Sequence, residues 1–433
     1  MEIRSSDLAA ACHGRLDGPD AVIDGASIDS RSIRPGQLFV PVVAARDGHE
    51  FVPAALKRGA AAYLTARDPV GGTAVVVDDT VDALQAIGRL ARDRLTCPVV
   101  GITGSVGKTS VKDLLAAALS VSLKTTASER SFNNELGVPL TLLSAPADAE
   151  AVVVEMGARG IGHIAALCAV AQPTIGVVTR VATAHTEAFG TIDEVARAKG
   201  ELPEALPADG TAVLFAEDDR VVAMAQRTRA RVLTYGEGGD VRAIWLEVDD
   251  DLRPTFTLVS PWGNAVVELA ARGVHQVDNA LGAAAVALVC GLSPGQVAEG
   301  LGAATLSPWR MELASTPSGA RVLNDAYNAN PVSVAAALRS LVSLPATRRV
   351  AVLGVMAELG VRSDEEHASI GALARELGVR LVAVAAPAYG GDVDVADVDA
   401  AIEALGALGP DDAVLVKGSR VAALESLAQA LLR

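Results

Sequence analysis

The sequence is poor in cysteine, in aromatic residues and in positive charge, and each shortage excludes a class of protein. Its four cysteines have no paired spacing, so we expect neither a disulfide framework nor a zinc site. Aromatic residues make up 3% of the chain and apolar residues 50%, which favours helices packed on buried parallel strands over an aromatic-rich sandwich. A net charge of −15 argues against a nucleic-acid-binding surface.

Long hydrophobic runs and a secretory leader are missing as well. The first residues lack the basic start and apolar core of a signal peptide. The longest apolar run, Ala280 to Leu292, is shorter than a membrane span. We therefore expect a soluble, cytoplasmic protein with no membrane partner, and a monomer as the default state.

The chain is long enough for more than one domain. A helical pattern runs from Glu50 to Ala62, residues 241–270 are typical of a strand meander, and Ser363 with Glu366 has capping-box spacing at the start of a helix. Apolar strands alternate with helices over the rest of the chain. We predict an α/β fold with three domains: a small N-terminal α/β domain (1–82), a central P-loop domain with a doubly wound sheet (97–309) and a C-terminal Rossmann-like domain (310–433).

The strongest motif is the stretch 101–110, GITGSVGKTS, which lies between an apolar strand and a helical pattern, as a phosphate-binding loop requires. A standard P-loop has its first glycine at the position that Ile102 occupies here. Backbone N–H groups at Gly104 and Gly107 would approach phosphates, Lys108 would neutralise charge and Thr109 would bind Mg²⁺. An incidental lysine in an ordinary turn is the alternative, and the flanking strand and helix argue against it.

Further polar residues stand where predicted strands end. Glu155 closes one apolar strand and His185 follows the next, so both would lie on one rim and fit a Mg²⁺ site. A solvated acid and a hydrogen-bonded structural histidine are the plain alternatives. Lys199 by itself is typical of a surface helix. Asn279 would bind a nucleotide or cap a helix, and its spacing does not decide between the two.

The segment 324–331, NDAYNANP, follows a predicted strand and is polar throughout. Asn330 and Pro331 suit an N-cap followed by proline at the first helical position. That explanation leaves Asp325, Tyr327 and Asn328 without a role, and polar clusters on such loops are disproportionately functional.

Together these motifs resemble those of the Mur ligases, ATP-dependent amide-forming enzymes that build the peptidoglycan precursor peptide. The resemblance extends over essentially the whole chain. GITGSVGKTS is similar to the family's Gly-x-Thr-Gly-x-x-Gly-Lys-Thr, and DSR (29–31) with DGHEFVPAALKRGA resembles its uridine-nucleotide-binding domain. The motifs closest to the member that accepts D-alanyl-D-alanine are SFNNELGVPLTLL, VVVEMGARGIGHI, AHTEAFGTIDEVARAKGE, DAYNANP, LGVMAELG, His367 and VKGSR.

The resemblance implies a role for each matching residue. Lys108, Lys199 and His185 would be catalytic, and Lys199 matches a lysine that the family carbamylates. Two Mg²⁺ ions would be organised by Thr109, Glu155, His185 and Lys199. ATP would be held by Gly104, Ser105, Val106, Gly107, Lys108, Thr109, Ser110, Asn279, Arg310 and Asp325. The other substrates would meet Ser30, Arg31, Asn133, Asn134, Tyr327, Asn328, Lys417, Ser419 and Arg420.

The implied reaction is the joining of D-alanyl-D-alanine to UDP-muramoyl-tripeptide through an acyl phosphate made with ATP, with the C-terminal domain closing over the nucleotide. Alternatives are a sibling ligase that adds one amino acid, a folylpolyglutamate synthetase, a P-loop phosphotransferase and a nucleotide-gated binding protein. A diaminopimelate- or lysine-adding sibling would show a DNPR-like segment, where this chain has DAYNANP. Three residues depart from the family pattern: Gln276, Val355 and Arg180.

Overall fold

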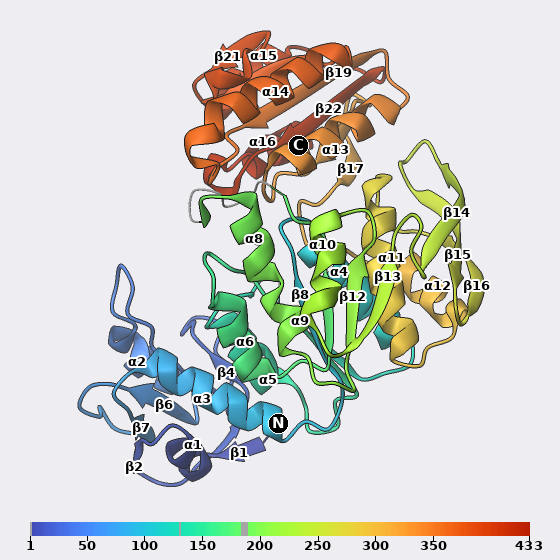
Figure 1. Cartoon of the computed structure of the whole chain (residues 1–433). Helices are drawn as coiled ribbons and strands as arrows, with labels where there is room; N and C mark the ends of the chain where they lie inside the picture. Colours follow the sequence, from blue (N-terminus) through green and yellow to red (C-terminus); the bar gives the residue numbers. More distant parts are fainter. Residues whose placement is uncertain (1, 130, 183–188) are drawn as a thin grey trace.

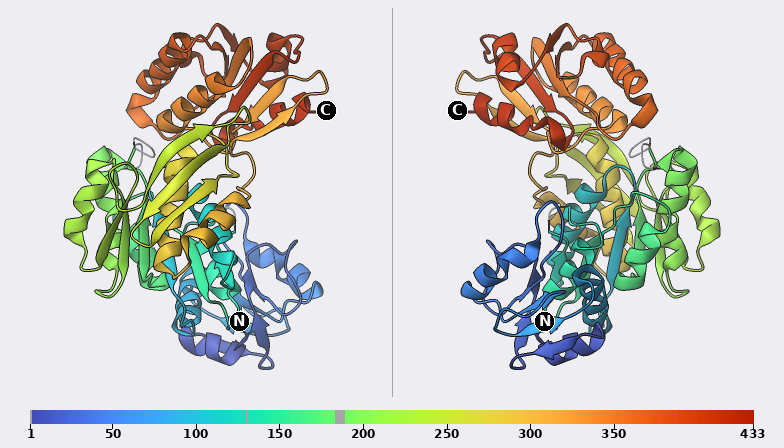
Figure 2. Two further views of the ribbon diagram at one scale, coloured as in Figure 1. Left: turned by 90° about the vertical axis from the view of Figure 1, so that its right-hand side faces the viewer. Right: turned by 90° about the vertical axis from the view of Figure 1, so that its left-hand side faces the viewer.

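The computed structural model describes residues 2–129, 131–182 and 189–433. Three bodies follow one another along the molecule, with the N-terminal body at one end and the C-terminal body at the other (Figures 1 and 2). We name them the N-terminal part (2–96), the central part (97–309) and the C-terminal part (310–433). The three-domain α/β expectation is confirmed, whereas the boundaries themselves stay predictions.

The N-terminal part has a five-stranded sheet in the order β2-β7-β6-β5-β4 and a separate β1-β3 pair. The predicted helix from Glu50 to Ala62 is wrong in extent. It divides into η1 and α2, which ends at Lys57 because Gly59 turns the chain with a φ of +96°, and Ala62 already begins β6. The elements are β1 Glu2–Arg4, α1 Ser5–Ala11, β2 Arg15–Asp17, β3 Val22–Asp24, β4 Ala26–Ser27, β5 Leu38–Phe39, η1 Gly48–Phe51, α2 Val52–Lys57, β6 Ala62–Thr65, β7 Ala74–Val76 and α3 Thr80–Asp93.

The central part contains an all-parallel sheet in the order β13-β12-β11-β8-β10-β9. Its inner strands are apolar and fully buried, because α4 and α11 pack on one face and α5, α6 and α9 on the other. The predicted meander at 241–270 is the antiparallel sheet β14-β15-β16. In the first half of this part the elements are β8 Val99–Thr103, α4 Lys108–Ser120, β9 Thr125–Ala127, α5 Gly137–Ser144, β10 Ala151–Glu155, α6 His163–Ala171, β11 Ile175–Val178, α8 Ile192–Lys199 and α9 Glu201–Ala205.

The second half of the central part supplies the rest of that sheet and the meander. Helix α3 joins this part to the N-terminal one, since it packs against α5 and α6, and one apolar core runs through both parts. The elements are β12 Thr211–Phe215, α10 Asp219–Ala223, η2 Met224–Arg227, β13 Arg231–Tyr235, β14 Arg242–Val248, β15 Pro254–Ser260, β16 Gly263–Glu268, α11 His275–Val289 and α12 Pro294–Gly302.

The C-terminal part is a second wound sheet, ordered β17-β18-β22-β19-β20-β21, in which only the edge strand β17 pairs antiparallel. Separate apolar clusters cover its two faces. The elements are β17 Glu312–Ser315, β18 Arg321–Asn324, α13 Pro331–Ser343, β19 Arg348–Gly354, η3 Gly360–Arg362, α14 Ser363–Glu376, β20 Arg380–Val384, η4 Pro387–Tyr389, β21 Val393–Val395, α15 Val398–Leu405, β22 Asp412–Lys417, η5 Arg420–Ala422 and α16 Glu425–Leu431.

The capping box predicted at Ser363 and Glu366 is wrong. The turn η3 runs directly into α14, so Arg362 is the N-cap residue and makes no side-chain cap. Glu366 pairs with Arg362 at 2.8 Å instead, and the Ser363 carbonyl accepts a hydrogen bond from His367 Nδ1 at 2.6 Å.

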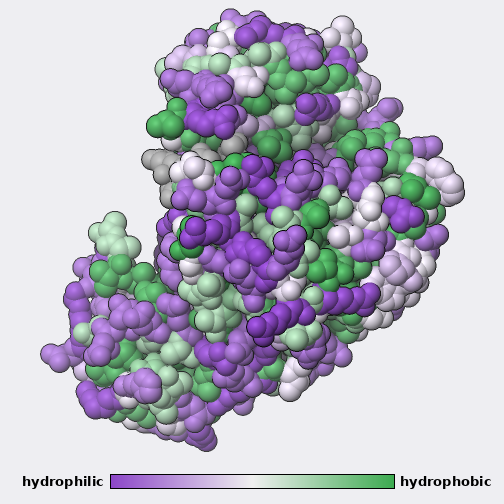
Figure 3. Space-filling view, in the orientation of Figure 1, coloured by the Kyte–Doolittle hydropathy of each residue, from purple (hydrophilic) through white to green (hydrophobic). Residues whose placement is uncertain are grey.

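The surface in Figure 3 is mixed, with polar residues predominant over the central part and a notch in the outline between the N-terminal and central parts. Within the described ranges, no helix combines the length and the apolar character needed to cross a bilayer.

Candidate active site

The glycine-rich loop connects β8 to α4, and close contacts fix its shape. Gly104 and Gly107 have φ values of +144° and +88°. A Cβ on Gly104 would lie 1.9 Å from Thr179 Oγ1, and one on Gly107 would lie 2.4 Å from Asn279 Oδ1. Both positions therefore require glycine for conformation and for space. The first N–H groups of α4 face the loop without helical partners, as an anion site requires.

The loop is also fastened to the end of β11. Ser105 N donates to the Arg180 carbonyl at 2.7 Å, and Thr179 Oγ1 donates to the Val106 carbonyl at 2.5 Å. Arg180 thus serves the loop through its backbone, so the departure from the family pattern at this position leaves that contact in place.

Lys108 is the first residue of α4 and folds back over the loop. Its Nζ donates to the Gly104 carbonyl at 2.8 Å. Burial lowers the pKa of Lys108, while the carboxylates of Glu155 and Glu358 act in the opposite direction. An ammonium held only by loop carbonyls would gain from the oxygens of a bound phosphate.

Glu155 provides a carboxylate oxygen with nothing to bind. The residue is 1% exposed at the end of β10, and its Oε1 accepts a hydrogen bond from Asn133 Nδ2 at 2.8 Å. Among the described residues Oε2 has no partner. A buried carboxylate oxygen without a partner, in a cavity that Thr109 also lines, fits a hard cation such as Mg²⁺.

One of the four expected metal ligands cannot be placed. His185 lies outside the described residues. Within the described ranges no three His, Cys, Asp or Glu side chains gather as a metal cluster. Thr109, Glu155, His185 and Lys199 as metal ligands therefore stay a prediction, supported here by the orphan oxygen.

Lys199 is the last residue of α8 and is 1% exposed, so the surface-lysine alternative is wrong. Burial and, to a lesser extent, the nearby Lys108 lower the pKa of Lys199 to about 7, while the carboxylates of Glu201 and Glu155 act in the opposite direction. A large fraction of its amine is therefore uncharged at neutral pH. An uncharged amine is the form that adds CO₂, and carbamylation stays a prediction.

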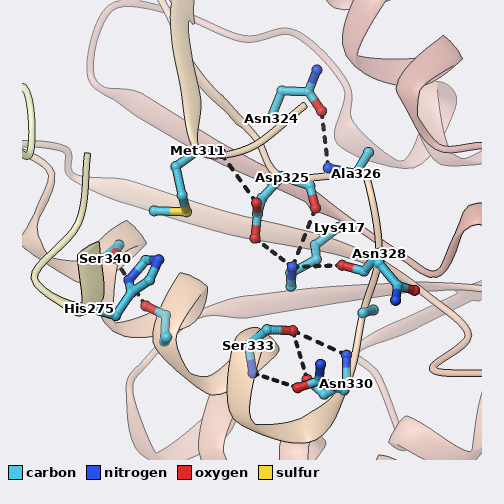
Figure 4. Close-up of polar contacts among 12 residues, drawn as sticks. His275, Met311, Asn324, Asp325, Ala326, Asn328, Asn330, Ser333, Ser340 and Lys417 are labelled. Carbon is cyan, nitrogen blue, oxygen red and sulfur yellow. Dashed lines mark hydrogen bonds and ion pairs between the residues drawn. The ribbon is translucent and has the colours of Figure 1, made fainter. Parts of the chain in front are cut away.

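The C-terminal rim centres on a buried ion pair, drawn in Figure 4. Lys417 Nζ donates to Asp325 Oδ2 at 2.5 Å and to the Asn328 carbonyl at 2.8 Å. Asp325 Oδ1 accepts from Met311 N at 3.2 Å. Asn330 caps α13 ahead of proline at the first helical position, as predicted. The polar segment 324–331 is thus fixed at both ends.

Tyr327 brings this rim to the central part. Its hydroxyl donates to Ser131 Oγ, and the Arg310 guanidinium lies 4.3 Å from the centroid of the Tyr327 ring. The Nε of Arg310 is buried without a partner among the described residues. Arg420 pairs with Glu425 at 2.7 Å, and its guanidinium lies 4.4 Å from the centroid of the Trp309 ring.

The sequence left open whether Asn279 binds a nucleotide or caps a helix, and its place in helix α11 excludes the cap. The helix begins at His275, so Asn279 lies inside it and is not a cap. Asn279 Nδ2 donates to Gln276 Oε1 at 2.8 Å, so the departure at Gln276 supplies a hydrogen-bond partner to Asn279. Burial lowers the pKa of His275 to about 4 and raises the pKa of Asp278 to about 6.

Two cavities meet at Lys108. The first, of about 680 Å³, lies between the central and C-terminal parts and is lined by the glycine-rich loop, α11 and the rim at Asp325. The second, of about 650 Å³, extends toward the N-terminal part, where Ile28 and Gln85 line it, and contains Lys199. Lys108 therefore lines both cavities, and a compound bound in either one would lie next to it.

Most of the predicted residues line one of these cavities, with exceptions. Ser30, Arg31 and Gly104 line neither cavity. Arg31 is 87% exposed and pairs with Asp29 at 2.8 Å. Asn134 lines the second cavity, but its Oδ1 accepts from Gly137 N at 3.0 Å and so supports the start of α5.

Ser419 lines the first cavity and also holds the backbone of residues 355–357 through two hydrogen bonds. Its Oγ accepts from Ala357 N at 2.9 Å, and its N–H donates to the Val355 carbonyl at 2.9 Å. The departure at Val355 leaves this backbone contact unchanged.

Sequence reasoning missed two charged residues that line both cavities, Arg159 and Glu358. Both lie inside motifs used for the resemblance, VVVEMGARGIGHI and LGVMAELG. Their position next to family-like residues was the available signal.

Comparisons with known proteins agree with this geometry. The family model "Mur ligase middle domain" matches residues 102–287, and "Mur ligase, glutamate ligase domain" matches residues 309–420. The UDP-N-acetylmuramoyl-tripeptide–D-alanyl-D-alanine ligase of Mycobacterium tuberculosis is 42% identical, over 97% of this chain and 93% of its own.

Solved structures are similar over nearly the full length. A crystal structure of MurF from Acinetobacter baumannii superposes with a TM-score of 0.90 at 30% identity, covering 100% of this chain and 99% of that one. MurF ligase from Thermotoga maritima in complex with ADP superposes with a TM-score of 0.83 at 27% identity, covering 94% and 96%.

Proposed function

The chain belongs to the Mur ligase family, and from this we propose that it joins D-alanyl-D-alanine to UDP-N-acetylmuramoyl-tripeptide at the expense of ATP. The observation that carries the proposal is the meeting of two cavities at Lys108, because the reaction must bring a nucleotide phosphate to a peptide carboxylate. The product is a precursor of peptidoglycan. The nucleotide-linked substrates support a reaction in the cytoplasm, and a monomer stays our expectation.

The first cavity holds ATP. The glycine-rich loop and the first turn of α4 offer N–H groups to the phosphates, and Lys108 turns from the Gly104 carbonyl to the phosphate oxygens. Asn279 lies against Gly107, and Arg310 and Asp325 approach from the C-terminal part.

The second cavity holds the muramoyl-tripeptide with its terminal carboxylate toward Lys108. Asn133 lies at this end, with its amide fixed on Glu155. Mg²⁺ bound by Thr109, Glu155, His185 and the carbamate of Lys199 would screen the negative charges of the two reactants.

The chemistry then runs in two steps. A carboxylate oxygen attacks the γ-phosphorus, and ADP leaves with the electron pair of the broken P–O bond. The dipeptide ammonium first releases a proton to water, and the resulting amine attacks the acyl carbon. Phosphate then leaves with the electron pair of the C–O bond and takes up the second proton that the nitrogen loses. The Tyr327 contact with Ser131 holds the C-terminal part over the junction, the place where the two cavities meet at Lys108. This contact keeps water from the acyl phosphate.

Phosphate release tests the proposal. The purified protein is given ATP with each UDP-muramoyl peptide in turn, and with D-alanyl-D-alanine or single amino acids as the acceptor. We expect release only with the tripeptide and the dipeptide together. Release with a single amino acid would favour a sibling ligase. A stable phosphorylated product formed without an acceptor would favour a phosphotransferase.

A further inference from the structure

Glu358 lies in the loop between β19 and η3 and is held in an unusual backbone conformation. Its φ is +66°, in the left-handed region that side chains other than glycine rarely adopt. Its neighbours Met356 and Leu359 are 1% and 2% exposed and belong to the apolar core of the C-terminal part. The loop is therefore anchored on both sides of one exposed carboxylate.

Backbone contacts fix the loop further. Met356 N donates to His367 Nε2 at 2.9 Å, and the other nitrogen of that ring contacts the Ser363 carbonyl at 2.6 Å. Ala357 N donates to Ser419 Oγ at 2.9 Å. Backbone strain that the surroundings hold in place is a feature of functional sites. Here two side chains from distant segments hold the residues just before Glu358.

Glu358 differs in charge from the other residues that line both cavities. Among the described residues, five line both cavities and so surround the junction: Lys108, Ser131, Asn133, Arg159 and Glu358. Two are cations, two are neutral, and Glu358 is the one anion. It is also the only one of the five that belongs to the C-terminal part.

The three reactants differ in charge at this junction. The γ-phosphate of ATP and the tripeptide carboxylate are anions, so a carboxylate repels both. The amino group of the dipeptide is an ammonium ion in neutral solution and must reach the acyl carbon from the side that the phosphate loop leaves open. A carboxylate presented by the C-terminal part is complementary to that ammonium alone.

We propose that Glu358 binds the ammonium group of the incoming dipeptide and orients its nitrogen toward the acyl phosphate. This inference rests on the proposed function and names its acceptor-binding residue. His367 and Ser419 are positioning residues, because they act through the loop that carries Glu358.

A simpler role would be to neutralise Lys108, whose ammonium Glu358 also influences. The two roles predict different defects. Loss of a partner of Lys108 would disturb ATP binding and acyl-phosphate formation, which precede the dipeptide. Loss of the ammonium site would leave both intact and weaken only the use of the dipeptide.

The test uses Glu358→Gln, which keeps the size and removes the charge. The matched control is Glu365→Gln, on the neighbouring helix α14. The Glu365 side chain is 75% exposed, and its carboxylate is paired only loosely with Arg362, at 3.5 Å. KM is measured for each substrate, and acyl phosphate formed without dipeptide is trapped by borohydride reduction. We expect the dipeptide KM of Glu358→Gln to rise about ten- to hundredfold, with KM for ATP and acyl-phosphate yield within about twofold of wild type.

A dipeptide KM within about twofold of wild type would overturn the inference, and so would an equal rise in KM for ATP or a parallel loss of trapped acyl phosphate. If Glu358→Gln lowers the Tm, Glu358→Asn, which tolerates left-handed backbone, takes its place with the same expected result. Glu358→Asp should recover part of the dipeptide affinity. Failure of the wild-type protein to use D-alanyl-D-alanine at all would refute the proposed function instead, because that result does not depend on Glu358.

Discussion

The central part and the C-terminal part each bury a lysine at the site, and they treat it in opposite ways. We call the two places the central rim, where Lys199 lines the second cavity, and the C-terminal rim, where Lys417 lines the first. On the C-terminal rim Lys417 is 2% exposed and is bonded to Asp325 Oδ2 and to the Asn328 carbonyl. On the central rim Lys199 is 1% exposed, and within the described ranges it forms no ion pair. Its nearest aromatic ring, that of Phe189, is 5.8 Å from Nζ.

The difference separates a structural cation from a reactive amine. Burial lowers the pKa of Lys417, while the Asp325 carboxylate, bonded to its Nζ at 2.5 Å, acts in the opposite direction. Lys199 has no such ion-pair partner among the described residues, and burial lowers its pKa to about 7. On the C-terminal rim, Lys417 holds the loop 324–331 in place. On the central rim, Lys199 has the lowered pKa that is typical of reactive amines.

Removing the reactive amine should have the largest effect. We expect Lys199→Ala to lower the rate of phosphate release about a thousandfold, because the variant cannot form the carbamate that we propose as the negative group near the phosphates. Short carboxylic acids added to the assay should restore part of the activity by filling the vacated space. The measurement is phosphate release with and without each acid.

The outcome that contradicts the carbamate is a lack of rescue in a variant that still binds metal. Lys417→Ala is the comparison variant for the other rim. Its lysine has a structural role, so acids should not restore its activity.

The free energies of unfolding of Lys417→Met and Lys199→Met compare the contributions of the two lysines to stability. Lys417→Met leaves the Asp325 carboxylate buried without its cation, so we expect a loss of about 3 kcal/mol. Lys199→Met removes a buried amine without an ion-pair partner, so its stability should stay within about 1 kcal/mol of wild type or rise. Urea unfolding in bicarbonate-free buffer at pH 7 measures both. Equal losses in the two variants would remove the distinction between a structural and a reactive lysine.

This distinction marks the limit of what the sequence could predict. The glycine-rich loop was predictable because strand, glycines and helix are consecutive in the chain, and the structure adds that Thr179 and Asn279 leave no room for a Cβ. The wound sheets were predictable because their strands are continuous apolar runs. Lys199 looked like a surface residue because its burial comes from segments far away in the sequence.

The errors have similar causes. The helix at 50–62 was overextended because Gly59 ends it through a left-handed turn, and the capping box at Ser363 failed because η3 already begins the helical path. Glu358 was overlooked because neither its backbone angle nor its place between two cavities can be read from residue type. Local signals predicted elements, and long-range packing decided which polar residues meet.

The smallest expected effect lies where the two rims touch. His275 of the central part is under the influence of both Asp325 and Lys417 (Figure 4), and burial lowers its pKa from 6.5 to about 4. The folded protein therefore keeps this ring neutral at a pH where the unfolded chain binds a proton. Stability from His275 is fully present above pH 6.5 and is lost as the pH falls toward 4.

His275→Gln removes this titration, so the two proteins should diverge only below pH 6.5. After allowance for solvent screening we expect wild type to lose about 1 kcal/mol more than the variant between pH 7 and pH 4.5. Urea unfolding at several pH values measures the difference. Parallel curves would mean that the ring is protonated as easily in the folded protein as in water. Burial of His275 between the two rims would then impose no cost on its charged form.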